Sequence, residues 1–318
     1  MVKRFVAWVP WLLLACAAKP PTSDVKAAVV PPPAPAVVSA TPEPPQAAPV
    51  AAAPAFRDCG ELSCKAFPSA VAAFDYVLRD APRVLAIGEA HAQSETPGAA
   101  AKSASSTKRF MDDLLPRLAP RAADLVIELW LANGSCGKVE QKVQKQQSAV
   151  TAPQAATNQG DFMNLGFRAK ALGITPHALV PSCEQYQKIA GAGAADIEEM
   201  LAMIKSVTQR DVEELLSKRA PERLVVAYGG AMHNDLVPRA GREDFSFGPE
   251  LSRVTAQRYV ELDLVIPEQI KDSEAWRALP WYPHYSREKA GTEAYLYSWA
   301  PHAYALLFPK AADAEPAP

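Results

Sequence analysis

Two short segments of the chain carry the residue types that acid–base or metal chemistry needs. The first is Gly88-Glu89-Ala90-His91, and the second is Gly229-Gly230-Ala231-Met232-His233. Glu95 follows His91 by four residues, so the two side chains would share one face if the chain turns helical there. Imidazole and carboxylate groups can hold a divalent metal that activates water, or can move a proton directly. The two segments are therefore candidate walls of one pocket.

Each segment follows a compact apolar run, at 83–87 and 223–228. Ligands of an open α/β sheet bind in the crevice beyond the carboxyl ends of its strands. Glu128 stands inside a third apolar run, at 124–131, where a buried carboxylate must be paired, hydrogen-bonded or ligating. Asp235 adds another acid just after the second segment. We expect the candidate catalytic side chains to converge at one sheet edge: Glu89, His91, Glu95, Glu128 and His233.

The elements that must position these residues alternate between strand and helix. Such alternation predicts an α/β fold with a mostly parallel central sheet and helices on both faces. Pro116 should end the helix that is predicted at 106–115. The apolar runs predict strands at 83–87, 124–131, 174–180, 223–228, 259–266 and 303–308, and helical spacing predicts helices at 68–80, 106–115, 137–149, 160–172 and 195–219.

The amino terminus predicts export and anchoring. Residues 1–16 form a basic start and a short apolar stretch that ends at Cys16, which resembles a bacterial lipobox. We expect cleavage before Cys16, its lipidation, and attachment to a membrane of the bacterial cell envelope, the outer one where the cell has two. The alternative is an ordinary signal peptide with a fortuitous cysteine. Residues 17–56 hold 11 of the 30 prolines and predict a disordered tether, whereas 57–308 suit one α/β domain and 309–318 a disordered tail.

Net charge and cysteine content narrow the possible classes of protein further. A formal net charge of −2 gives no basic footprint for nucleic acid. Without Cys16, an even number of cysteines remains, which in an oxidising compartment predicts disulfides. A zinc site is the alternative, but no Cys-x-x-Cys spacing is present. We expect the pairs Cys59–Cys64, which is local, and Cys136–Cys183, in which each cysteine follows a predicted strand.

The two glycine- and histidine-containing segments resemble the paired motifs of the erythromycin esterase–TraB–Tiki superfamily, which also contains haem-binding lipoproteins of the ChaN type. The resemblance covers residues 80–310 and implies an α/β fold of two related halves whose histidines and acids line one cleft. Glu89, His91, Glu95 and His233 match the motif positions, and Glu128 matches on the second strand. The first motif lacks the extra residue of macrolide esterases, and Ala92-Gln93-Ser94 replaces the aromatic and histidine-rich run of the haem branch.

Three hypotheses for function follow. The preferred one is a hydrolase for a small-molecule or peptide substrate, an esterase or a peptidase, with His and Glu acting directly or with Glu89, His91 and His233 holding Zn, Mn or Fe. The second is a lipoprotein that binds haem or another small ligand. The third is a non-catalytic cell-surface protein. Candidate axial haem ligands are Tyr228, Tyr186, His177 and His284, and the aromatic residues that could floor a cleft or pack in a core are Trp276, Trp281, Tyr282, Tyr285, Tyr295, Tyr297 and Trp299.

Overall fold

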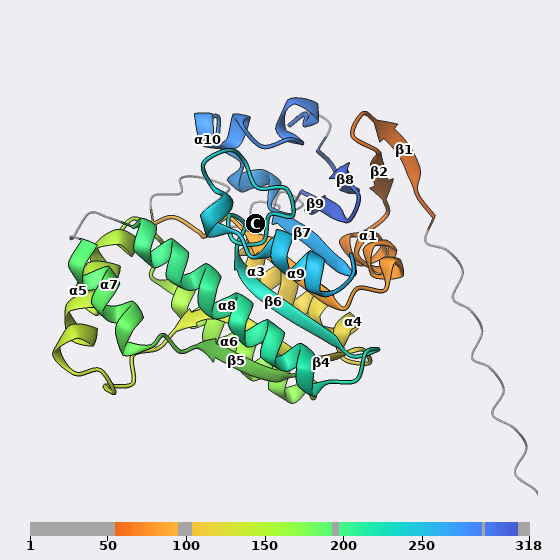
Figure 1. The fold of residues 1–318 in the computed structure, drawn as a ribbon. Helices are drawn as coiled ribbons and strands as arrows, with labels where there is room; N and C mark the ends of the chain where they lie inside the picture. Colours follow the sequence, from red (N-terminus) through yellow and green to blue (C-terminus); the bar gives the residue numbers. More distant parts are fainter. Residues whose placement is uncertain (1–54, 95–103, 193–196, 288–289, 311–318) are drawn as a thin grey trace, which may run out of the picture. The chain divides into compact units, whose positions relative to one another are not determined.

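A nine-stranded sheet forms the centre of the protein (Figure 1). The computed structural model describes residues 55–94, 104–192, 197–287 and 290–310, all within a compact unit that runs from Ala51 to Pro318. The strand order is β1-β2-β8-β9-β7-β3-β6-β4-β5. The strands are β1 (Arg57–Gly60), β2 (Cys64–Phe67), β3 (Val84–Glu89), β4 (Ala122–Trp130), β5 (Thr175–Leu179), β6 (Leu224–Gly230), β7 (Tyr259–Val265), β8 (Ala294–Ala300) and β9 (Ala303–Leu307).

Neighbouring strands run parallel from β9 to β5, and β8, β2 and β1 extend the sheet in antiparallel fashion. The expected α/β class with a mostly parallel sheet is therefore confirmed. Strand β3 lies between β6 and β7, and β6 lies between β3 and β4. The carboxyl ends of these four strands consequently meet at one edge, where a parallel sheet presents its ligand crevice.

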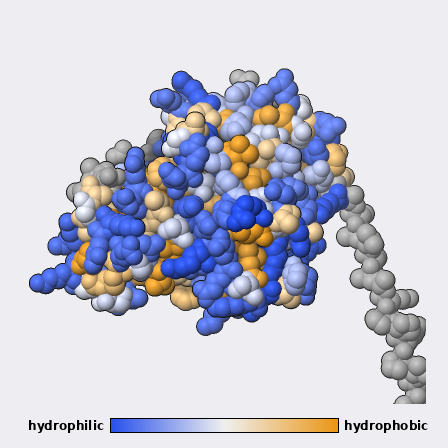
Figure 2. Space-filling model, viewed as in Figure 1, coloured by the Kyte–Doolittle hydropathy of each residue, from blue (hydrophilic) through white to orange (hydrophobic). Residues whose placement is uncertain are grey.

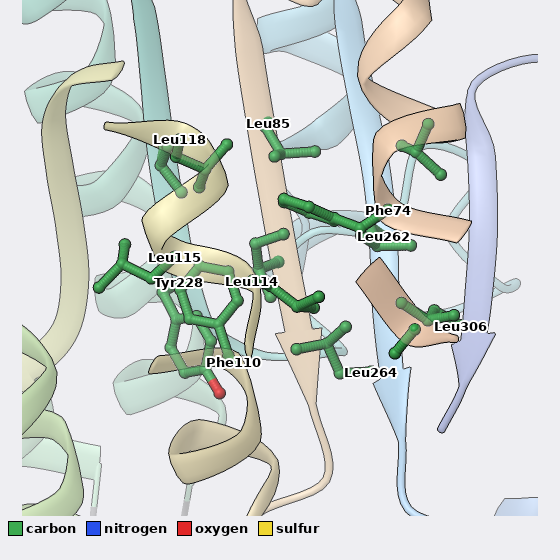
Figure 3. Close-up of a cluster of buried hydrophobic side chains, with 14 of the residues drawn as sticks. Phe74, Leu85, Phe110, Leu114, Leu115, Leu118, Tyr228, Leu262, Leu264 and Leu306 are labelled. Atoms are coloured by element: carbon green, nitrogen blue, oxygen red, sulfur yellow. The ribbon is translucent and has the colours of Figure 1, made fainter. Parts of the chain in front are cut away.

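Helices cover both faces of the sheet, which agrees with the prediction. On one face α1 (Ala70–Val77), α4 (Leu115–Leu118) and α6 (Thr157–Ala171) pack against alternate strand residues, and α3 (Ser106–Arg109) contacts α6. Figure 3 shows this layer, where Phe74, Leu114 and Leu118 meet Leu85 and Leu262. Because parallel strands are buried on both sides, their sequences read as nearly continuous apolar runs.

The other face carries α8 (Glu198–Lys218), which lies across β4 and β6, together with α5 (Lys138–Thr151), α7 (Cys183–Ala192) and α9 (Gly248–Val254) (Figure 1). The remaining helical elements are short. They are α10 (Glu274–Arg277), the π-helical segment Phe110–Leu114 and the 3₁₀ turns Leu78–Asp80, Glu243–Phe245, Pro267–Gln269 and Tyr282–His284.

The helix that was expected to end at Pro116 continues to Leu118, so that prediction is wrong. A π-helical segment, Phe110–Leu114, precedes Pro116 and places it within the first two residues of α4. Proline is tolerated in the first turn of a helix because its missing N–H would have no partner there. The widened π turn thus lets the chain restart a helix at the proline.

Both expected disulfides are present. Cys59 and Cys64 join β1 to β2 with their Cα atoms 5.1 Å apart. Cys136, just before α5, joins Cys183 at the start of α7 with Cα atoms 5.3 Å apart. Both separations lie within the range that a disulfide requires.

The carboxyl-terminal aromatic residues form a third apolar cluster beside β8 and β9. Trp281 is buried and contacts the rings of Trp276, Tyr282, Tyr285 and Tyr297. The face drawn in Figure 2 is mostly hydrophilic, with hydrophobic residues in separate patches. Among the described helices, none has the length and apolar content to cross a membrane.

Candidate active site at the ends of β3, β4 and β6

Glu89 ends β3 and is held by three donors. Its Oε2 accepts hydrogen bonds from the Tyr228 hydroxyl (2.6 Å) and from Thr107 Oγ1 (2.8 Å). Its Oε1 lies 3.2 Å from Nδ1 of His91. Tyr228 belongs to β6 and Thr107 to α3, so two neighbouring elements orient this carboxylate. Burial and the charge of Glu89 raise the pKa of Tyr228, which keeps its hydroxyl protonated as a donor.

His91 lies between two carboxylates. Nδ1 faces Glu89, and Nε2 lies 3.7 Å from Oε1 of Glu128. Burial by itself would lower the pKa of His91, but the attraction of Glu128 and Glu89 outweighs it and raises the pKa to about 10. At neutral pH the ring is therefore an imidazolium, which can donate a proton or stabilise a developing negative charge.

Glu128, on β4, faces both histidines. Its Oε1 lies 3.7 Å from Nε2 of His91 and 3.9 Å from Nε2 of His233. Its Oε2 accepts a hydrogen bond of 2.7 Å from the backbone N–H of Gly230. Burial would raise the pKa of Glu128, but its interactions with His233 and His91 and this N–H lower it to about 2. Glu128 is thus a fixed negative charge between two imidazoles.

The glycine pair at the end of β6 makes room for this arrangement. A Cβ atom on Gly229 would overlap Oε2 of Glu128 and lie 2.8 Å from its Cβ. A Cβ atom on Gly230 would lie 3.2 Å from Nε2 of His91. Glycine therefore serves here because the backbone of β6 approaches two functional side chains closely.

His233 is buried and oriented by the backbone. Its Nδ1 lies 2.8 Å from the carbonyl oxygen of Phe245. A carbonyl only accepts, so Nδ1 carries the proton in the neutral ring and Nε2 is left with the lone pair. Since Nε2 faces Glu128, this lone pair points into the same space as the imidazolium of His91.

A cleft of about 980 Å³ opens onto these groups. Residues of β3, β4, α5, α6, α8 and the segment after β6 line it, together with Trp276 and Leu279. That volume suits a drug-sized molecule or a short peptide segment. Leu131 and Ile197 are exposed apolar side chains on its wall, and Arg239 and Arg242 also contact it. The cleft thus combines apolar walls with converging polar groups.

The structure brings four of the five expected catalytic residues together, because Glu89, His91, Glu128 and His233 all line this cleft. Glu95 and Cys16 lie outside the described residues. The four candidate haem ligands do not line the cleft in the described part of the chain. Of these, Tyr228 and Tyr186 are buried, His177 pairs with Asp124, and His284 pairs with Glu61.

A different set of residues comes closest to a preformed cation site. Asp235, Glu261 and Asp263 offer oxygen atoms that all lie within 4.8 Å of one another, and no other acid, histidine or cysteine set of the described residues meets this condition. The expected set of Glu89, His91 and His233 is instead an ion-paired network, in which both nitrogens of His91 face carboxylates. That network can therefore act through its own side chains.

Burial raises the pKa of each member of the acidic cluster. The pKa of Asp235 rises to about 6 through burial, against the opposing charges of Arg239 and Arg242. Burial and the charge of Asp235 raise the pKa of Asp263 to about 8, and burial with both neighbouring acids raises the pKa of Glu261. The cluster needs protons or a cation to balance its charge at neutral pH.

Sequence reasoning missed part of this constellation. Thr107 and Tyr228 act on Glu89, yet no local pattern marks either as a partner. Glu261 and Asp263, by contrast, carry a visible signal, since they are two acids at alternate positions of an otherwise apolar strand. Glu128 was predicted from the same kind of pattern, an acid within an apolar strand.

Comparison with known proteins leaves the family open. No family model and no curated protein matches the chain. Among solved structures, the type III effector HopBA1 aligns with 82% of this chain and 100% of its own, at 8% sequence identity and a TM-score of 0.38. A similarity at that level carries no conclusion about function.

Proposed function

We propose that this chain is an envelope lipoprotein with a hydrolase site built from His91, His233, Glu128 and Glu89. One observation carries the proposal: Nε2 of His91 and Nε2 of His233 face the same oxygen of Glu128 inside the cleft. Hydrolysis of an ester, a lactone or a peptide needs an acid and a base within reach of the same reacting bond. The resemblance of the two motifs to the erythromycin esterase–TraB–Tiki superfamily, including its two related halves, points in the same direction.

In the proposed reaction, Nε2 of His233 takes a proton from a water molecule while the water oxygen bonds to the substrate carbonyl carbon. The charge of Glu128, whose Oε1 lies 3.9 Å from the same nitrogen, stabilises the imidazolium that forms at His233. The imidazolium of His91 stabilises the negative charge that develops on the carbonyl oxygen. The bond to the leaving group then breaks, and the leaving oxygen or nitrogen takes a proton from His91. Proton exchange with solvent restores both rings.

The experiment is a screen of ester, lactone and peptide substrates with the purified full chain. For an active substrate, His233→Ala and His91→Ala should each lower kcat by about 10²–10⁴, the usual contribution of a positioned acid or base. His284→Ala is the matched control, because His284 pairs with Glu61 and lies outside the cleft lining. Full turnover in both cleft variants would refute the proposal, and a Soret band in the purified protein would favour the haem-binding alternative.

Anchoring through Cys16 is the second part of the proposal, and it rests on the short apolar stretch that precedes this cysteine. Metabolic labelling with a radioactive fatty acid should mark the wild-type chain and should leave Cys16→Ala unlabelled. A labelled Cys16→Ala variant would contradict lipidation at this position.

A further inference from the structure

Three buried or half-buried acids meet beside the histidines of the proposed hydrolase site. Glu261 and Asp263 lie two positions apart on β7 and so project from the same face of the sheet. Asp235 joins them from the segment that follows β6, and oxygen atoms of all three lie within 4.8 Å of one another. Among the described residues, none of the three forms an ion pair with lysine, arginine or histidine.

Another buried acid of the same sheet, Asp124, is paired with cationic side chains. Asp124 is fully buried on β4, and it is paired with Arg219 through both of its oxygens and with His177 through one. Arg239 and Arg242 are near enough to Asp235 to lower its pKa, but they make no such pair with it. The cluster is therefore a group of buried acids that the described side chains leave without an ion-pair partner.

Two buried oxygen atoms at the cluster also lack a hydrogen-bond partner. They are Oε1 of Glu261 and Oδ1 of Asn234, whose side chains are 1% and 2% exposed. Asn234 is not one of the three acids, and its Nδ2 donates to Oδ1 of Asp263 at 3.2 Å. Burying an acceptor without a partner destabilises the fold, so a native structure supplies a partner or fills the place with an ion or water.

Gly88 lets these oxygens approach the backbone of β3. A Cβ atom at this position would overlap Oδ1 of Asp263 and would lie 2.7 Å from the unpartnered Oδ1 of Asn234. The two oxygens therefore lie against the same point of the β3 backbone, which they can approach because residue 88 has no side chain. Asp235 and Asp263 also line the 980 Å³ cleft, so the cluster can be reached from solvent through it.

We propose that Asp235, Glu261 and Asp263, with the side-chain oxygen of Asn234, bind a hard divalent cation such as Mg²⁺, Mn²⁺ or Ca²⁺. Carboxylate and amide oxygens are the donors these ions prefer, and the cluster offers neither the imidazole nor the thiolate that favours zinc. A cation here would tie β7 to the segment that carries His233, because Asp235 follows His233 by two residues. The site is separate from the His91–Glu128 network and needs no catalytic activity.

The test is cation binding by the purified full chain after treatment with a chelator and dialysis. Isothermal titration and thermal unfolding are recorded with Mg²⁺, Mn²⁺ and Ca²⁺ separately, with K⁺ as a control for ionic strength. We expect at least one divalent ion to bind saturably with one site per chain and to raise the Tm, because a ligand that binds only the folded state stabilises it.

Asp263→Asn and Glu261→Gln should each weaken cation binding by at least about tenfold. Even the loss of a residue that only hydrogen-bonds a metal ligand typically weakens binding by about that factor. Without cation, both variants should melt at the wild-type temperature or above it, since each replaces a buried acid that has no cationic partner with a neutral amide of similar size. Asp244→Asn is the matched control, being an exposed acid of the segment after β6. His91→Ala should bind the cation normally, which separates this site from the proposed hydrolase centre.

Absence of binding heat and of a Tm shift with all three divalent ions would overturn the proposal. Wild-type affinity in both Asp263→Asn and Glu261→Gln would overturn it as well. A loss of binding in His91→Ala would move the site to the histidine network and would equally refute the assignment.

Discussion

Nδ1 of His233 lies 2.8 Å from the backbone carbonyl oxygen of Phe245, and this contact decides which nitrogen of the ring is basic. The carbonyl accepts only, so the proton stays on Nδ1. Nitrogen-detected NMR of the histidine rings should therefore show the neutral form of His233 protonated at Nδ1. The resonance is assigned from its loss in His233→Ala. A neutral ring protonated at Nε2 would remove the base from the proposed reaction.

The close approach of Gly229 to Glu128 gives a prediction for activity. Gly229→Ala places a methyl group on Oε2 and near Cβ of Glu128, so this carboxylate must move. A misplacement of about 1 Å can cost about 10²-fold in rate, and overpacking costs about 1–3 kcal/mol in stability. Turnover of the screened substrate and urea unfolding measure the two effects.

Gly166 supplies the control for that substitution. It lies inside α6, and an added Cβ would meet its nearest neighbour, Cδ1 of Ile127, at an ordinary 3.5 Å. Gly166→Ala should stabilise the protein by up to about 1 kcal/mol, through helix propensity, and should leave turnover unchanged. Equal activity of Gly229→Ala and Gly166→Ala would show that the position of Glu128 is not critical.

The parallel core of this fold could be predicted from the sequence. The run at 83–87 became β3 (Val84–Glu89), and the run at 259–266 became β7 (Tyr259–Val265). Strands that are buried on both faces have long apolar sequences, which can be recognised without knowledge of the tertiary structure. The outer strands β1, β2 and β8 escaped detection, because β1 is largely exposed and β8 mixes buried with half-exposed residues.

Part of the candidate site could likewise be predicted from the sequence, and part could not. Glu89, His91 and His233 follow glycine at strand ends, and Glu128 interrupts an apolar strand, so each is visible locally. The meeting of Asp235 with Glu261 and Asp263 depends on the path of the segment after β6 over β7. Such a path is fixed by tertiary packing, as in the hydrogen bond from the Leu236 N–H to Oε2 of Glu261, and no local pattern encodes it.

The two disulfides should differ in what they contribute to stability. Cys136–Cys183 closes a separation of 47 residues, whereas Cys59–Cys64 closes one of 5. In the chain-entropy description, the long loop corresponds to about 4 kcal/mol and the short one to about 2 kcal/mol. Urea unfolding of the two double Cys→Ser variants should show this order. A larger loss on removal of Cys59–Cys64 would mean that native contacts, not loop closure, set the values.

The buried ion pair of Asp124 gives a dependence of stability on pH. Burial would raise the pKa of Asp124, but the hydrogen bonds and charges of Arg219 and His177 outweigh it and lower the pKa below its usual value. The group is thus more acidic in the folded chain than in the unfolded one, whose Asp pKa is about 3.9. Its contribution to stability is complete above that unfolded value and is lost as the pH falls through the folded pKa.

Asp124→Asn should therefore lower the free energy of unfolding at neutral pH by about 2–3 kcal/mol, less than for a fully buried pair because Arg219 is partly exposed. The difference from wild type should shrink as the pH falls below about 4, where the wild-type carboxylate also becomes protonated. Asp75→Asn, which removes a surface pair with Arg117, should cost less than about 1 kcal/mol. Urea unfolding at a series of pH values measures all three proteins. A difference between Asp124→Asn and wild type that stays constant down to the acid limit would show that the charge of Asp124 does not stabilise the fold.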